Sequence, residues 1–463
     1  MIESGPIETR AALLRHDKVQ GLWIGPQLGG GFYAGRVARV DEALGGAFLD
    51  LGDDKADAGQ GFLNASDGGL PVEGETLLVQ MKRPPIGGKG ALLTRNFQLA
   101  TPLMTWLPMT GKRKLAIDKK IIAPEERERL TQLMQEKGFK GELRIRPLMM
   151  GISAEIGRQA FTNLRMQYDA MVKAIKEDKT PRHLSQPRAA AAALTHFADH
   201  APAQIEVSGL AGFLEVKALV EKQLGHRKVG LNAVQEVDLF ERCGAEETLE
   251  RALSPVVALA GGGRITIDEM EALTAIDIDV AATPGQSRKG SIIKACLEAI
   301  PVIFRQLMMR KIGGQVVIDF PALAAKGGGQ LLSSLKAEAK KMPGARLGKM
   351  SDGGLFHLTL PKPEETLLER MTQKSGPGPV LGRVFTSKVL AAKAVRCLEK
   401  AMADAPATNF ILEIAPDIAT WLEHHNQWHS MITERFGSRF KVLAKEGQAR
   451  EVFDVREKTC EKT

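Results

Sequence analysis

The chain has 463 residues and a mass of 50.2 kDa, more than one hydrophobic core usually organises, so we expect roughly two to four domains. Its residues are 44% hydrophobic and 25% charged, a globular composition that excludes collagen-like, disordered and disulfide-scaffold proteins. Lysine and arginine number 63 against 55 acidic residues, and the formal charge of +8 mildly favours a polyanionic partner.

The sequence predicts a cytoplasmic protein. No stretch approaches the roughly 18 consecutive apolar residues that a membrane-spanning helix needs. The first 20 residues carry charged side chains in place of the apolar core of a signal peptide. The four cysteines are far apart and form no C-x-x-C pair, so neither a disulfide framework nor a local zinc site is indicated.

Residues 32–100 are predicted to form a small all-β unit. Alternating segments with glycine turns indicate strands at 32–40, 46–52, 61–63 and 76–81. The pattern is typical of a five-stranded barrel, and an OB-fold fits the strand count and length. Because such barrels stack nucleobases on exposed aromatic rings, Phe48 and Phe62 are candidate nucleic-acid contacts. The alternative, that both rings fill the barrel core, stays open.

A basic run overlaps the end of this unit. Between residues 82 and 114 the chain has seven positive side chains and no acidic one. They are Lys82, Arg83, Lys89, Arg95, Lys112, Arg113 and Lys114. In a chain with 55 acidic residues, such a gap favours nucleic-acid contact over an ordinary solvated surface.

The rest of the chain alternates helices and strands, which indicates α/β architecture. We expect a helix from Pro124 to Gly138, a strand at 143–146 and a long helix at 153–176. The polar segment 176–188 contains two prolines and is a candidate domain boundary. A small α/β domain is predicted from Val384 to the end of the sequence.

Three consecutive elements carry candidate chemistry. A buried strand at 272–279 is followed by a helix at 291–310 and a second buried strand at 315–320. Such a crossover unit places its two strands parallel, so their carboxyl ends meet at one edge of the sheet. Asp277 and Asp319 lie at these ends, where open α/β sheets bind their ligands.

A divalent metal ion would explain this arrangement. Asp279 lies two residues beyond Asp277 and projects to the same side if the strand continues. Carboxylates this close repel one another unless a hard cation neutralises them, and Mg²⁺ is the natural choice. Taken singly, each aspartate is explained equally well as the cap of a turn or helix. The basic run upstream favours the metal site.

Six stretches of the sequence form a set of motifs whose order and spacing span nearly the whole chain. They are Gly35–Val37, Ala47–Gly52, Gly61–Leu63, Lys89–Thr94, Glu271–Asp277 and Gly313–Phe320. In these stretches the chain resembles the ribonuclease E/G family of bacterial endoribonucleases. The last two stretches are the most specific.

The resemblance implies a multidomain α/β and β fold. It would begin with an RNase H-like domain (1–30 and 188–255), which is interrupted by an OB-fold RNA-binding barrel (31–100) and a 5′-end sensor region (101–187). A DNase I-like catalytic domain (256–372), a linker (373–383) and a small C-terminal α/β domain (384–463) would follow.

The resemblance also implies magnesium-dependent cleavage of single-stranded, often AU-rich RNA in RNA processing or decay, leaving 5′-phosphate and 3′-hydroxyl ends. The family's metal-binding aspartates fall on Asp277 and Asp319, and we expect Asp279 to orient metal or water. The family's RNA contacts fall on Phe48, Phe62, Lys82 and Lys89, to which the basic run adds Lys112, Arg113 and Lys114. Arg146 matches the arginine that helps to bind a 5′-monophosphate.

The sequence departs from the family pattern at several positions. Asp279 stands where the family usually has Asn, Pro147 where the 5′-sensing Thr is expected, and Asp352 where an Arg is usual. The zinc-binding cysteine pair is missing, so any homo-oligomer must form without the family's zinc link. These departures leave open a second hypothesis, a catalytically weakened or inactive RNA-binding protein. A phosphoesterase for small substrates would leave the barrel and the basic run unexplained.

Overall fold

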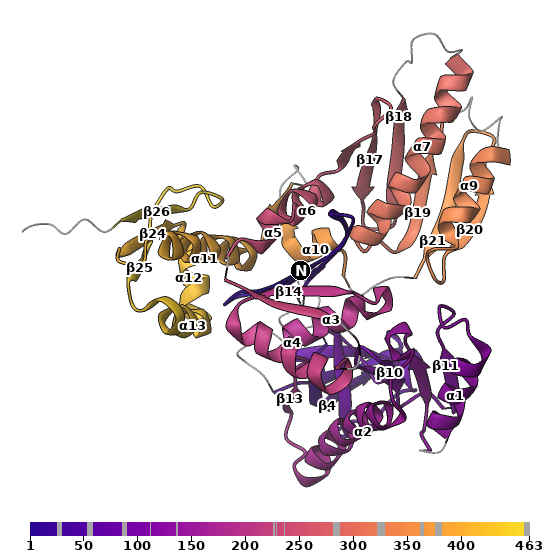
Figure 1. The fold of residues 1–463 in the computed structure, drawn as a ribbon, viewed down its shortest axis with the longest axis horizontal. Helices are drawn as coiled ribbons and strands as arrows, with labels where there is room; N and C mark the ends of the chain where they lie inside the picture. The colour runs from indigo at the N-terminus through magenta and orange to yellow at the C-terminus, as the bar shows by residue number, and fades with distance from the viewer. Residues whose placement is uncertain are drawn as a thin grey trace, which may run out of the picture. The chain divides into compact units, whose positions relative to one another are not determined.

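In the computed structural model, the described residues are 1–25, 30–52, 59–85, 90–111, 113–135, 138–225, 227, 229–235, 237–280, 288–321, 329–361, 365–375 and 382–457. They belong to two compact units. The first comprises residues 1–13, 23–240 and 387–463, and the second comprises 14–22 and 241–386. Both units contain helices and strands (Figure 1), so the predicted mixed α/β multidomain class is confirmed. Among the described residues, no helix combines the length and apolar character needed to cross a membrane.

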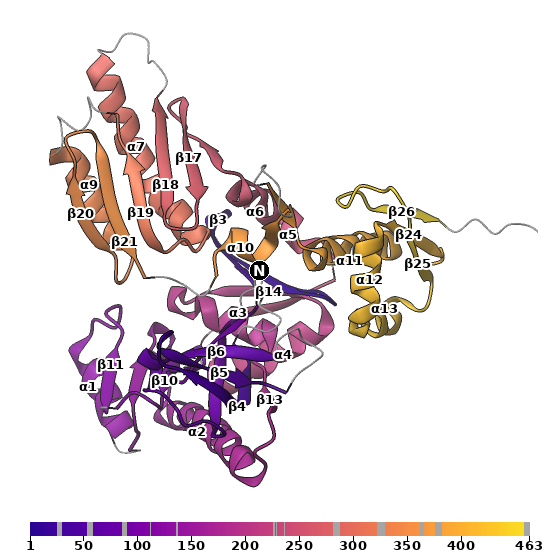
Figure 2. The same ribbon diagram turned by 180° about the vertical axis from the view of Figure 1, so that it is seen from behind.

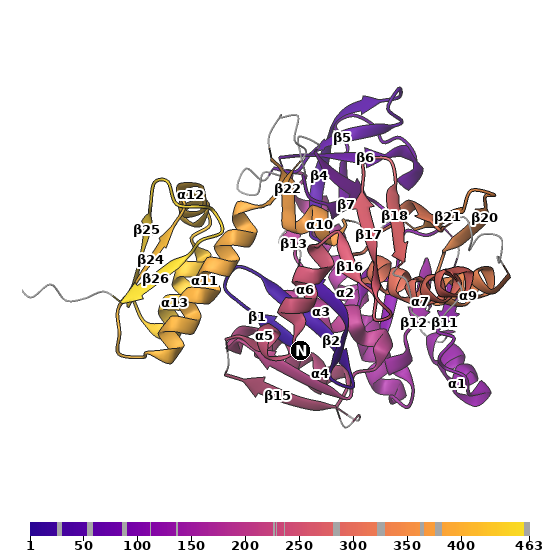
Figure 3. The ribbon, with the colours of Figure 1, turned by 90° about the horizontal axis from the view of Figure 1, so that it is seen from above.

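Five strands of the first unit close into a barrel. Figure 3 shows four of them, β4, β5, β6 and β7, close together. In pairing order they are β4 (Phe32–Asp41), β5 (Gly46–Asp50), β6 (Gln60–Asn64), β8 (Ala91–Thr94) and β7 (Thr76–Arg83). The last of them, β7, pairs with β4 and completes the ring. A further strand, β13 (Arg182–Ser185), pairs antiparallel with β4. The closed five-stranded ring is consistent with the predicted OB-fold.

The alternation along the barrel strands separates an inner from an outer face. Ala47, Leu49 and Leu63 are fully buried inside the barrel, whereas Phe48 and Phe62 alternate with them and remain half-buried. The two phenylalanines are register partners, with ring centroids 5.2 Å apart. Gly46 leaves room for them, because a Cβ there would lie 2.3 Å from the ring of Phe62. Both rings therefore lie outside the barrel core.

Two other sheets belong mainly to the first unit, although residues 14–22, in the last two strands of the first sheet, are assigned to the second unit. One has the order β15 (Gly230–Val234), β14 (Gln204–Ser208), β1 (Ile2–Ser4), β2 (Thr9–Arg15) and β3 (Lys18–Ile24). The other has the order β11 (Lys114–Ile117), β12 (Glu142–Ile145), β10 (Met104–Leu107) and β9 (Leu99–Ala100). The accompanying helices are α1 (Pro124–Gln135), α2 (Ala154–Glu177), α3 (Ala189–Phe197) and α4 (Leu210–Gln223).

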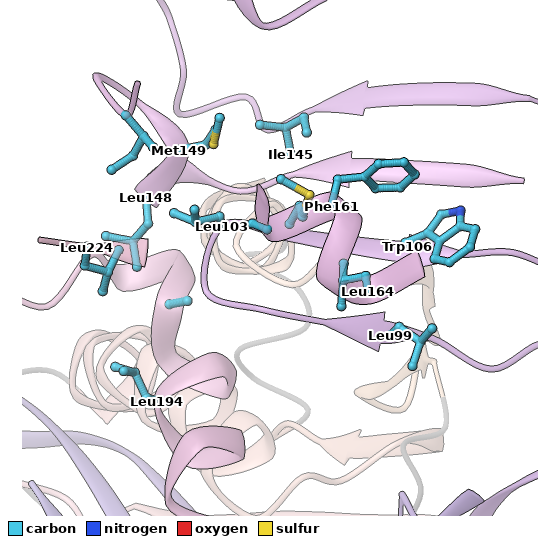
Figure 4. Close-up of a cluster of buried hydrophobic side chains, with 14 of the residues drawn as sticks. Leu99, Leu103, Trp106, Ile145, Leu148, Met149, Phe161, Leu164, Leu194 and Leu224 are labelled. Carbon is cyan, nitrogen blue, oxygen red and sulfur yellow. The ribbon is translucent and has the colours of Figure 1, made fainter. Parts of the chain in front are cut away.

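A single apolar core joins these sheets and helices. Figure 4 shows Trp106 of β10, Phe161 of α2 and Leu194 of α3 in one cluster of buried side chains. The rings of Trp106 and Phe161 meet edge to face, with centroids 5.5 Å apart. The region that follows the barrel is therefore packed onto the helices near residue 200 and does not have a core of its own.

The end of the chain forms a three-stranded sheet in the order β25 (Phe440–Ala444), β24 (Phe410–Ile414) and β26 (Asp454–Glu457). Three helices accompany it: α11 (Ser387–Asp404), α12 (Pro416–His424) and α13 (Gln427–Phe436). The sequence predicts a helix at 388–402, a strand at 409–414 and a helix at 417–423, and the bounds of α11, β24 and α12 agree with these within two residues.

Buried charges join α11 to the first strands of the chain. Arg396 of α11 lies 2.6 Å from a carboxylate oxygen of Glu8. One turn later, Glu399 is 3% exposed and accepts a hydrogen bond of 3.3 Å from Arg435 of α13. Burial raises the pKa of the Glu399 carboxyl to about 7, and the neighbouring Arg435 offsets only part of this effect.

We expect Glu399→Gln to stabilise the protein by up to about 3 kcal/mol near pH 8. The carboxyl has a pKa near 4.5 when exposed and about 7 in the folded protein, so the folded state binds the proton more tightly. The stability that this proton confers is present below pH 4.5 and is lost as the pH rises through 7. Glutamine does not ionise. Thermal melting should therefore show a gain in Tm that grows with pH up to about pH 8. A gain that is equal at acidic and alkaline pH would contradict this prediction.

The second unit is built on a six-stranded sheet. Its order is β16 (Val256–Ala258), β17 (Gly263–Glu269), β18 (Thr274–Val280), β19 (Gly314–Asp319), β21 (Leu355–Leu360) and β20 (Arg346–Met350). Helix α7 (Arg288–Met309) links β18 to β19, which pair in parallel as predicted. Figures 1 and 2 show α7 and α9 (Gly329–Ala339) on the same face of the sheet.

Shorter elements complete the connections of the chain. They are α5 (Leu239–Arg242), α6 (Ala245–Leu253), α10 (Leu367–Met371), β22 (Thr372–Lys374) and β23 (Arg383–Phe385). A capping box begins α10: the Thr366 hydroxyl accepts from the Glu369 backbone N–H, and the Glu369 carboxylate accepts from the Thr366 backbone N–H. The face of the six-stranded sheet opposite α7 and α9 carries the exposed side chains of Asp277, Asp279 and Asp319, which belong to the site described next.

Candidate active site

The sheet of the second unit brings two of the predicted aspartates side by side. Asp277 of β18 and Asp319 of β19 are direct register partners in the parallel strand pair. Register partners point to the same face of a sheet, and both of these side chains are exposed. Their neighbours Ile276 and Ile318 are buried in the core beneath α7. The two carboxylates therefore emerge together on the face that the helices do not cover.

The third aspartate is engaged by an arginine that the sequence interpretation missed. Asp279 is the register partner of Arg264 on β17, and the Arg264 Nε donates to the Asp279 carboxylate at 2.7 Å. The two side chains are 59% and 50% exposed, respectively. In the part of the chain that the structure describes, no three His, Cys, Asp or Glu side chains are grouped around one possible metal position. The structure thus places a carboxylate pair beside an ion pair.

Asp352 lies in an exposed turn close to the end of β19. The turn connects β20 to β21, and the carbonyl of Gly354 accepts a hydrogen bond of 3.1 Å from the backbone N–H of Phe320. Leu355, which follows the turn, is the register partner of Asp319. This edge of the sheet therefore carries a negative side chain at position 352.

On the barrel, a row of side chains crosses all five strands on the outer face. We call it the barrel row; in pairing order it consists of Arg39, Phe48, Phe62, Leu92 and Arg83. The guanidinium of Arg39 lies over the ring of Phe48, 4.8 Å from its centroid. Two half-buried aromatic rings between two arginines offer stacking and positive charge together, as single-stranded nucleic acid requires. Arg83 belongs to the basic run that favours nucleic-acid contact, whereas Arg39 was not singled out from the sequence.

The basic run is divided between two sheets. Lys82 is exposed on β7 of the barrel, whereas Lys114 is exposed on β11 of the neighbouring sheet and lies 3.6 Å from Glu142. Arg113 precedes β11 and stacks on Phe139, with 4.8 Å from the guanidinium carbon to the ring centroid. The two remaining predicted contacts, Lys89 and Lys112, lie outside the described residues.

Arg146, the candidate 5′-phosphate contact, follows β12 and is 13% exposed. Its Nε donates to the Asp199 carboxylate at 2.7 Å, and its Nη1 donates to the carbonyl of Thr101 at 3.3 Å. Pro147 begins a short 3₁₀ helix immediately after it and is buried. The arginine is therefore held in place by protein groups, one of which carries a negative charge.

Comparison with known proteins shows which family and which relatives the chain is similar to. The model of the Ribonuclease E/G family matches residues 99–362. Ribonuclease G of Haemophilus influenzae is 26% identical over 488 residues, which cover 97% of each chain. Ribonuclease G of Escherichia coli (strain K12) is 26% identical over 490 residues, or 98% of each chain. Ribonuclease E of Haemophilus influenzae is 30% identical over 327 residues, which cover 62% of this chain and 33% of that relative.

The family match includes every strand from β10 to β21, and with it the paired carboxylates of β18 and β19. The similarity to the ribonuclease G proteins extends over the barrel as well. Both agree with the motifs on which the sequence interpretation was based. The chain belongs to the ribonuclease E/G family, and it is accordingly an endoribonuclease, a hydrolase.

Proposed function

We propose that the protein is a Mg²⁺-dependent endoribonuclease that cleaves single-stranded RNA into products with 5′-phosphate and 3′-hydroxyl ends, acting in cytoplasmic RNA processing or decay. The observation that carries the proposal is the register pairing of Asp277 with Asp319 on an exposed sheet face. Such a pair of adjacent carboxylates can bind a divalent cation, and a cation at the phosphate would help a ribonuclease to cleave it.

The residues present fit a magnesium ion. Mg²⁺ prefers hard oxygen ligands and is usually held by one or two carboxylates, with water and substrate phosphate completing its shell. Asp277 and Asp319 supply two carboxylates from adjacent strands, and their exposure leaves room for the RNA backbone. A bound Mg²⁺ would activate water and neutralise the charge that develops on the phosphate. Asp279 would orient that site from its position two residues along β18.

The barrel row would hold the RNA strand. Its two rings can stack successive bases, and Arg39 and Arg83 can offset the charge of the backbone. Lys82, Lys89 and the segment 112–114 would extend this contact. Because base stacking is tolerant of sequence, this surface favours single-stranded RNA over a particular sequence.

The remaining assignments follow the family. We propose an RNase H-like domain formed by 1–30 and 188–255, a sensor region at 101–187, a DNase I-like domain at 256–372 and a small domain at 384–463. Any homo-oligomer would form without the family's zinc link, since the four cysteines, Cys243, Cys296, Cys397 and Cys460, include no C-x-x-C pair.

For the sensor region, we expect Asp199→Asn to increase the preference for 5′-monophosphorylated over 5′-hydroxyl RNA. In the wild type the Asp199 carboxylate is ion-paired with Arg146 at 2.7 Å, so it competes with an incoming phosphate for the Arg146 guanidinium. Neutralising it should raise the ratio of kcat/KM for the two RNAs several-fold, and Arg146→Ala should lower the ratio to about one. The same ratio in Asp199→Asn and wild type would exclude this competition.

The function is tested with purified protein and a short, single-stranded, AU-rich RNA that carries a 5′-monophosphate. Internal cleavage in Mg²⁺ that stops in EDTA is expected, and ligation or mass spectrometry of the products should identify 5′-phosphate and 3′-hydroxyl ends. The departures at Asp279, Pro147 and Asp352 motivate the alternative of an inactive RNA-binding protein. Tight, salt-sensitive binding of several RNAs without any cleavage would establish that alternative and refute the nuclease.

A further inference from the structure

The ion pair between Arg264 and Asp279 lies at the same sheet edge as the proposed metal aspartates. Arg264 is the second residue of β17, which runs antiparallel to β18, and it lies directly opposite Asp279. Asp279 follows Asp277 by two residues, a distance of roughly 7 Å along a strand. The net charge of this pair therefore changes the electrostatic potential at the carboxylates that would hold the metal.

The ion pair compensates the extra negative charge of Asp279. A third carboxylate at this edge would add one negative charge where the family usually has a neutral Asn. A charge that lies closer to a metal ion than the Debye length, about 8 Å at physiological ionic strength, is only partly screened by salt. It therefore changes the affinity of the site for the metal. The Arg264 guanidinium neutralises that charge locally, because it lies 2.7 Å from the carboxylate of Asp279.

We infer that Arg264 is a positioning residue of the nuclease site: it holds Asp279 in an ion pair, so that the metal ion meets two carboxylates and a neutral neighbour. The inference rests on the proposed function for its metal site. The two half-exposed side chains contribute little to the stability of the fold, because water and salt screen ion pairs at the surface. Their role is thus expected to be visible in metal binding and not in folding.

The test is a four-variant cycle in which Mn²⁺ binding to the RNA-free protein is measured by calorimetry. Arg264→Gln releases the negative Asp279, so Mn²⁺ should bind about threefold or more tightly. Asp279→Asn leaves Arg264 with an excess positive charge, so Mn²⁺ should bind about threefold or more weakly. The double variant should return to within about twofold of the wild type. Arg264→Lys keeps the charge and should also stay close to the wild type.

Turnover provides the second measurement. With Mg²⁺ at saturation, Arg264→Gln should lower kcat, because the freed carboxylate competes for the metal, and the added Asp279→Asn should restore it. The matched control is Arg251→Gln on α6, which breaks a somewhat more exposed pair with Glu247 and removes the same charge elsewhere in the second unit. It should leave Mn²⁺ affinity and kcat unchanged.

The outcomes separate this inference from the proposed function. Arg264→Gln with unchanged or weaker Mn²⁺ affinity, in a wild type that binds Mn²⁺ and cleaves RNA, overturns the inference alone. A wild type that binds Mn²⁺ but never cleaves RNA overturns the proposed function, while the cycle still tests the ion pair. A wild type that binds no Mn²⁺ overturns the metal site and, with it, both proposals.

Discussion

Asp319→Asn is expected to lower the rate of RNA cleavage by about 1,000-fold or more and to leave RNA affinity within about twofold of the wild type. The amide keeps the size of the side chain but removes one of the two charges that we propose face the metal. We propose that RNA is held mainly on the barrel row, which belongs to the first unit, so its binding should not depend on Asp319. Single-turnover cleavage and filter binding on the same protein sample measure the two quantities.

The control for this variant is Asp268→Asn. Asp268 is another exposed aspartate of the same sheet, on β17 opposite Ala275, and it lies outside the proposed site. It should cleave RNA at close to the wild-type rate. Equal losses in Asp268→Asn and Asp319→Asn would show that any charge on this sheet face matters and that the metal assignment is wrong.

Phe48→Ala is expected to weaken binding of single-stranded RNA by about 5- to 150-fold, since a base stack contributes roughly 1–3 kcal/mol. The ring is only half-buried, and its partners in the barrel row are Phe62 and the Arg39 guanidinium. Truncation therefore removes a stacking platform and one cation–π contact without opening a cavity in the barrel core. Fluorescence anisotropy with a labelled oligonucleotide measures the loss.

The matched control is Leu70→Ala, which truncates an exposed apolar side chain between β6 and β7 of the same barrel. It should bind RNA as the wild type does. If Phe48→Ala also bound RNA normally, while both variants kept the wild-type melting temperature, the barrel row would not be the RNA-binding surface.

The crossover that forms the site was predictable because each of its steps has a strong physical rule. Two apolar strands joined by a periodic helix must lie parallel in one sheet, and the structure has β18 and β19 so placed, with Asp277 opposite Asp319. The barrel was predictable for a similar reason, since alternation and glycine turns have few other solutions. Its fifth strand, β8, was not identified from the sequence; it has only four residues, with no alternation to mark them.

Which side chains pair within the site could not be predicted from these rules, because the pairing depends on the register of the strands. The Arg264–Asp279 pair follows from the tight turn between Glu269 and Thr274, from which the two strands run back in step. A turn shifted by one residue would have placed a different side chain opposite Asp279. The side of the barrel that Phe48 faces was uncertain for another reason. A strand phenylalanine is usually a core residue, and only the buried Ala47 and Leu49 on either side show that its ring points outward.

The pairing of β1 with β14 also fixes an order of events during synthesis. Ile2 has Val207 as its partner, whereas the five barrel strands lie between residues 32 and 94. On the ribosome the barrel can therefore close while β1 still has one open edge and no parallel neighbour. An unpaired strand edge invites aggregation, and long-range parallel pairing is slow. We expect the nascent chain to need chaperone protection over its first strands until residue 208 has emerged.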